Sequence, residues 1–149
     1  MKTVFAFIFI LGTCVQRTNT QGQKFSIDIW DYNYSMAYTV HYKINEDSVI
    51  AISLSGIQNE NDKFILNRGI TQIEKKKLYD FLSYFPIESL ASEYKNQLVS
   101  DGDIKKIEIV FKGKRKSIDV ENFYQKDIDR LFNEINQVFE KDVIIKYMK

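Results

Sequence analysis

The stretch YTVHYKINEDSVIAI, residues 38–52, decides the fold because it carries two strand patterns around a short polar turn. Apolar and polar side chains alternate along residues 37–44, which predicts a strand with one buried face. Residues 48–55 predict a second strand, with Ile50, Ile52 and Leu54 facing inward. The link Asn45-Glu46-Asp47 is short enough to join the two strands as an antiparallel hairpin.

Further strand patterns lie on both sides of this hairpin. Residues 24–30 alternate, with Phe25, Ile27 and Ile29 on one side and Trp30 on the other. Residues 63–66 predict a short strand. Residues 104–112 and 115–121 alternate around a glycine-containing turn, which predicts a second hairpin.

Two segments change to helical spacing. Thr71 and Glu74 form a capping-box pattern at the start of the first helix, and Pro86 ends that helix. The second helix is predicted to carry Asp127 and Asp129 in its first turn and to extend for about 13–17 residues. Residues 89–97 suggest another helical turn or two, and residues 143–147 an edge strand or a tail. The predicted apolar stripes are Ile73, Leu78, Phe81, Leu82 and Phe85 in the first helix, and Ile128, Leu131, Phe132, Ile135, Val138 and Phe139 in the second.

This order of elements predicts an α+β fold. We expect a mainly antiparallel sheet of two hairpins plus extra strands, with two helices packed on one face. Neither a repeat nor a proline- or serine-rich linker divides the chain, so residues 23–149 are predicted to form a single domain.

The composition excludes several classes of protein. The chain has 149 residues, 44% of them hydrophobic, and a formal charge of +1, which does not fit a disordered chain or a typical nucleic-acid binder. Cys14 and His41 are the single residues of their types, which excludes disulfide scaffolds, zinc fingers and most mechanisms built on a Cys-His or Ser-His-Asp arrangement.

Residues 1–22 predict an export signal. Lys2 precedes eight consecutive apolar residues, a run too short to span a bilayer as a helix, and a polar segment follows. Cleavage after Cys14, cleavage near Thr20, and a degenerate lipoprotein box in which Cys14 is acylated all remain open. The mature chain is therefore expected in the periplasm, the cell envelope or the extracellular space.

Candidate binding residues come from an aromatic cluster and an acidic loop. Trp30, Tyr32 and Tyr34 share one side of a continued strand, where they could contact a sugar or peptide or could pack beneath a helix. Asp101 and Asp103 form the acidic candidate. His41 is interpreted as a surface residue. Two basic clusters are interpreted as solubilising charge or as contacts for anionic lipid or glycan, namely Lys75-Lys76-Lys77 and the group Lys112, Lys114, Arg115 and Lys116.

A family resemblance covers residues 38–120. The order of a hairpin (YTVHYKINEDSVIAI), a helix (TQIEKKKLYDFLSYF), a loop (SEYKNQLVSDGD) and a second hairpin (KIEIVFKGKRKSIDV) resembles a group of uncharacterised exported bacterial α+β domains. The resemblance implies an envelope or periplasmic location, and it implies no activity.

These observations predict a small, exported, non-catalytic binding protein. We expect a protein or glycan partner, no nucleic acid, no cofactor or metal, and membrane contact only through a lipid on Cys14. The alternative is an immunity or inhibitor protein that blocks an exported toxin or hydrolase. A third option is a small hydrolase with paired carboxylates, drawn from Glu88, Glu93, Asp101 and Glu108.

Overall fold

The computed structural model describes residues 24–33, 35, 39–55, 61–99 and 102–147. The predicted export signal with Cys14, together with Tyr34 and Asp101, lies outside these residues. The described elements are β1 (Phe25–Asn33), β2 (Thr39–Asn45), β3 (Ser48–Ser53), β4 (Lys63–Gly69), α1 (Gln72–Tyr84), the 3-10 turn η1 (Ile87–Ser89), β5 (Glu93–Lys95), β6 (Asp103–Phe111), β7 (Lys114–Glu121) and α2 (Lys126–Ile135).

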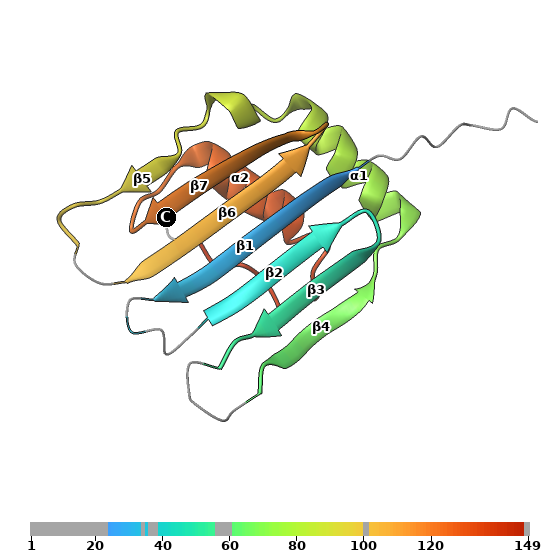
Figure 1. The fold of residues 1–149 in the computed structure, drawn as a ribbon, viewed down its shortest axis with the longest axis horizontal. Helices are drawn as coiled ribbons and strands as arrows, with labels where there is room; N and C mark the ends of the chain where they lie inside the picture. Colours follow the sequence, from blue (N-terminus) through green and yellow to red (C-terminus); the bar gives the residue numbers. More distant parts are fainter. Residues whose placement is uncertain (1–23, 34, 36–38, 56–60, 100–101, 148–149) are drawn as a thin grey trace, which may run out of the picture.

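The strands form one seven-stranded sheet with the order β4-β3-β2-β1-β6-β7-β5. Every neighbouring pair is antiparallel except β5 and β7, which are parallel. The predicted α+β class, with a mainly antiparallel sheet and two helices, is confirmed. Figure 1 shows β1 near the middle of the sheet and α2 behind it, so the face toward the viewer carries no helix.

The core lies between the sheet and the two helices. Alternate residues of β1, Phe25, Ile27 and Ile29, are at most 2% exposed and face Leu78 of α1 and Phe132 of α2 within one cluster. This arrangement removes apolar side chains from water on one sheet face only. The remaining side chains of each alternating strand lie on the opposite face of the sheet.

The inward face of β3 differs from the prediction. Val49 and Ala51 are fully buried, whereas Ile50 and Ile52 lie on the opposite face. Only Glu46 and Asp47 separate the paired ends of β2 and β3, which places Val49 opposite the buried Ile44. Because strand side chains alternate, this register moves both isoleucines away from the core.

Helix α1 begins as predicted and ends before Pro86. The Thr71 hydroxyl accepts a hydrogen bond from the Glu74 N–H, and the Glu74 carboxylate accepts one from the Thr71 N–H at 2.9 Å, which completes the capping box. The prediction that Ile73 joins the buried stripe is wrong, since this residue is 82% exposed. It lies in the first turn, before the helix reaches the core at Leu78.

The segment after α1 is mainly extended, so the prediction of one or two helical turns over residues 89–97 is wrong. Only η1 is helical, and it ends at Ser89. The Asp119 N–H donates to the Ser92 carbonyl at 2.9 Å, and the Asn96 N–H donates to the Glu121 carbonyl at 3.0 Å. Pairing with the edge of β7 therefore outweighs the local helical tendency.

Helix α2 is shorter than predicted. It ends at Ile135, although Val138 and Phe139 are buried beyond it in turns. The Asn136 side chain donates to the Ile145 carbonyl at 2.9 Å and accepts from the Ile145 N–H at 2.8 Å. These two bonds fold the following segment back onto the core, so that residues 143–147 are a packed tail and not an edge strand.

Candidate functional site

The uncovered sheet face carries Trp30 and Tyr32 of β1, as their alternation with the core residues predicts. A hollow of about 390 Å³ lies beside them. Strands β1, β2, β6 and β7 contribute its lining, which consists of Trp30, Tyr32, Thr39, Lys106, Ile107, Glu108 and Ser117. Aromatic surface beside charged and hydroxyl groups is the usual composition of a binding site.

Trp30 is held in place by its neighbour on β2. Its ring stacks on that of His41, with centroids 4.3 Å apart and an interplanar angle of 15°. His41 Nε2 lies 3.0 Å from Asp28 Oδ1, and Lys43 Nζ lies 3.8 Å from the same oxygen. His41 lies on the outer side of its strand, as predicted, and its side chain, stacked on Trp30, is 14% exposed.

Trp30 also belongs to a row of side chains that crosses the whole sheet on the uncovered face, which we call the Trp30 row. On one side, direct strand pairing continues through His41 and Ile52 to Phe64, which is 58% exposed. On the other side, pairing continues through Lys106 and Asp119 to Glu93. Directly opposed residues point to the same face, so the row is apolar at one end and charged at the other.

Asp103, a predicted binding residue, belongs to an ion-pair cluster with Lys105 and Asp31. The Lys105 ammonium donates to Asp103 at 2.6 Å and to Asp31 at 2.8 Å, and the Lys105 side chain is 1% exposed. Burial raises the pKa of the Asp31 carboxyl above its ordinary value, although the Lys105 charge opposes this shift. Lys105 and Asp31 lie on the core side of the sheet. Asp103 therefore does not join the hollow beside Trp30, although it lines a separate hollow at the end of β1 together with Tyr32.

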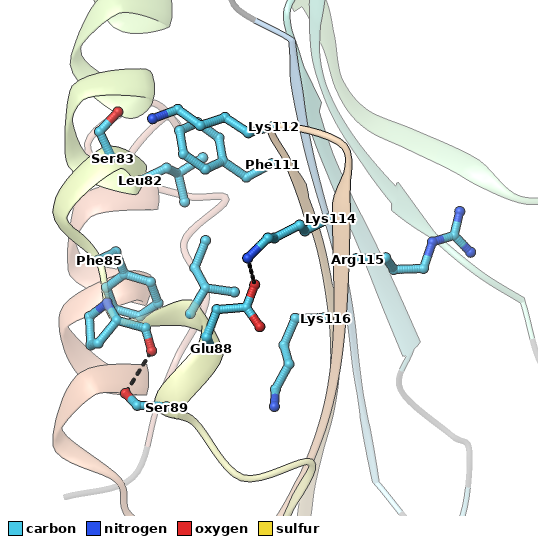
Figure 2. Close-up of a pocket in the computed structure, with 12 residues that line it drawn as sticks. Leu82, Ser83, Phe85, Glu88, Ser89, Phe111, Lys112, Lys114, Arg115 and Lys116 are labelled. Carbon is cyan, nitrogen blue, oxygen red and sulfur yellow. Dashed lines mark hydrogen bonds and ion pairs between the residues drawn. The ribbon is translucent and has the colours of Figure 1, made fainter.

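A second hollow, also of about 390 Å³, lies where α1 and η1 meet the turn between β6 and β7 (Figure 2). We call it the α1–hairpin hollow. Apolar residues and lysines share its lining, which consists of Leu82, Ser83, Phe85, Pro86, Ile87, Glu88, Ser89, Phe111, Lys112, Lys114, Arg115 and Lys116. The sequence showed the lysines as a cluster and placed Leu82 and Phe85 in the apolar stripe of the first helix, but it did not indicate that the two groups lie together.

Among the described residues, no group of three or more His, Cys, Asp or Glu side chains could hold a metal ion. In the same part of the chain, no helix is long and apolar enough to cross a membrane. Comparisons of the sequence with models of protein families and with curated proteins found no match. The resemblance to exported bacterial domains therefore stays a prediction.

Proposed function

We propose that this chain is an exported, non-catalytic binding protein, and that its uncovered sheet face binds a protein partner around Trp30. The observation that carries this proposal is the Trp30 row. Its apolar half, from Trp30 to Phe64, places an indole, an imidazole, an isoleucine and an exposed phenyl ring side by side across four strands.

A protein surface suits this face because the row is long. Protein interfaces are enriched in tryptophan, tyrosine and phenylalanine at their centres and are polar at their rims. Lys106, Glu108 and Asp119 lie beside the aromatic residues on the same face and supply such a rim. The stack of Trp30 on His41 holds the indole ring in place before binding, which lowers the entropy cost of association.

In this proposal the imidazole of His41 positions Trp30. Its Nε2 pairs with Asp28 and one face of its ring stacks on the indole, so the orientation of both rings is set before a partner binds.

The test is capture of a partner from an envelope extract of the source cells by the tagged mature chain. Trp30→Ala and Phe64→Ala remove the two ends of the apolar half, and each is expected to lower capture at least tenfold. Tyr84→Ala on α1 is the matched control, because Tyr84 is 86% exposed and lies on a helix that covers the other face.

Equal capture by the wild type and both row variants would overturn the proposal, as would binding of free oligosaccharide in place of a protein. An assay with the purified partner then distinguishes a general binding protein from an immunity or inhibitor protein. Loss of a hydrolase or toxin activity upon binding would identify the immunity or inhibitor protein considered from the sequence.

A further inference from the structure

The α1–hairpin hollow is an apolar depression at the end of the sheet far from Tyr32. Phe85 and Pro86 follow α1, Ile87 begins η1, and Phe111 ends β6, so three parts of the fold meet over one space. The hydroxyl groups at its wall are already used, because Ser83 donates to the Tyr79 carbonyl and Ser89 donates to the Pro86 carbonyl, both at 2.9 Å. The floor therefore offers apolar contact.

The rim of the hollow is positively charged. Lys112 and Lys116 reach it from the β6–β7 hairpin, whereas Arg115 points to the opposite side of the sheet (Figure 2). Within the described part of the chain, neither lysine forms an ion pair. Lys112 Nζ instead lies 5.0 Å from the centroid of the Phe111 ring and 6.0 Å from that of Tyr79.

One carboxylate also stands at the rim. Glu88 pairs with Lys114 at 3.1 Å, and both side chains are more than two-thirds exposed. This pair is neutral as a unit, so the ammonium groups of Lys112 and Lys116 set the sign of the rim. Arg130 of α2 adds a further positive charge nearby, with its guanidinium carbon 5.9 Å from the centroid of the Phe85 ring.

From this combination we infer that the α1–hairpin hollow binds a free straight-chain fatty acid, with the chain on the apolar floor and the carboxylate at Lys112 and Lys116. The volume of about 390 Å³ lies at the small end of the range for ligand pockets, about 300–1,000 Å³. A short chain of roughly ten carbons suits this space. This site is separate from the Trp30 row and does not depend on the function proposed for that face.

The test uses decanoate as the probe and the mature wild-type chain, followed by calorimetry and by amide chemical shifts in NMR spectra. The expected result is saturable binding, with shifts concentrated at residues 85–89 and 111–116. Octanoate, two methylene groups shorter, is expected to bind about fifteenfold more weakly, because each buried methylene contributes about 0.8 kcal/mol. Decyltrimethylammonium, with the same chain and the opposite charge, is expected not to saturate the site.

Two substitutions at the rim separate charge attraction from simple apolar contact. Lys116→Glu is expected to weaken decanoate binding at least tenfold, and Glu88→Gln is expected to strengthen it severalfold by removing a like charge. Lys63→Glu, an exposed position on the edge strand β4 that belongs to neither hollow, is the matched control and leaves the affinity unchanged. Circular dichroism verifies that each variant is folded.

Three results would overturn the inference. The first is equal affinity for decanoate and decyltrimethylammonium, and the second is equal affinity of the wild type and Lys116→Glu. The third is binding only to vesicles of phosphatidylglycerol, without saturable binding of free decanoate, which would make the lysines a contact for a membrane surface.

Discussion

Lys105 is a charged side chain in an almost dry position. It is 1% exposed, and the carboxylates of Asp31 and Asp103 compensate its charge. Removing one partner of a buried ion pair leaves the other charge without compensation, which costs far more than the intact pair contributes. The sequence contains a signal for this cluster, because Asp31 and Lys105 occupy core-facing positions in the alternation of their strands.

We predict that Lys105→Met lowers the free energy of unfolding by about 3–5 kcal/mol, because it leaves the Asp31 carboxylate buried without its cation. The double variant Lys105→Met, Asp31→Leu should recover most of that loss, since Asp103 can turn toward water. Urea unfolding of the wild type, the single variant and the double variant measures both effects. A single variant as stable as the wild type would contradict this account.

Glu74 joins the capping of α1 to Arg68 at the end of β4. The guanidinium donates to both carboxylate oxygens, at 2.8 and 3.1 Å, and also to the Val138 carbonyl at 2.6 Å. These bonds from Arg68, with those from Thr71, lower the pKa of Glu74 to about 2. One arginine therefore ties a strand, a helix and the segment after α2 together.

The lowered pKa of Glu74 predicts a pH dependence of stability. The ionised carboxylate stabilises the fold above the ordinary value of 4.5, and this contribution is lost as the pH falls from there toward 2. Glu74→Gln keeps an acceptor for the Thr71 N–H and removes the charge, so we expect a loss of about 1–2 kcal/mol at pH 7 after allowing for partial exposure. The difference between wild type and variant should shrink between pH 5 and pH 2.5 in urea titrations. A difference that is constant with pH would exclude the ion pair as its cause.

At the scale of elements, the β6–β7 hairpin depends on its turn. Lys112 has a φ of 50° and Gly113 a φ of 78°, and two consecutive positive values are characteristic of the tight turns that match the twist of a hairpin. No atom lies within 4 Å of a Cβ built on Gly113, so a side chain there would meet no steric obstacle beyond its own backbone.

Gly113→Ala is therefore expected to cost about 1 kcal/mol through the left-handed backbone alone. Gly69→Ala is the matched control. A Cβ at Gly69 would lie 3.8 Å from the Asp47 carbonyl oxygen, an ordinary contact, and its φ lies outside the left-handed region. The control should change stability by less than about 0.5 kcal/mol, as measured by thermal unfolding, and similar losses in both variants would refute a conformational cause.

Helices and strands could be predicted from the sequence wherever a local signal, such as a capping box or a short polar turn, determined where they begin or end. Thr71 and Glu74 identified the start of α1, and the two hairpins followed from short polar turns between alternating strands. The register of β3 could not be read from its residues, because Val49, Ile50, Ala51 and Ile52 are all apolar and both faces look alike. The two-residue turn sets the register of β3 against β2 and so pairs Val49 with Ile44. Because Ile44 is buried, the face of β3 that carries Val49 is buried as well.

At the scale of the whole molecule, the candidate site was predictable only in part. Alternation correctly placed Trp30 and Tyr32 together on one face and opposite to Asp31. It could not supply Lys106 and Glu108, because the pairing of β1 with β6 joins residues more than seventy positions apart. Strand order is a property of the assembled sheet, and no local pattern in either strand encodes it.

The place of β1 in the sheet also governs the order of events during folding. β1 precedes the other described strands in the chain, yet its neighbours are β2 and β6, and Phe25 pairs with Phe111. While the chain is being synthesised, the β2–β3 hairpin can close early, but the central strand stays without one partner until β6 has left the ribosome. Such distant pairing slows folding, because a long loop must close before its contacts form. The two halves of the sheet can therefore join in a nascent chain only after β6 has been synthesised, and the pairing that must wait, at the centre of the sheet, is the one that spans the longest stretch of chain.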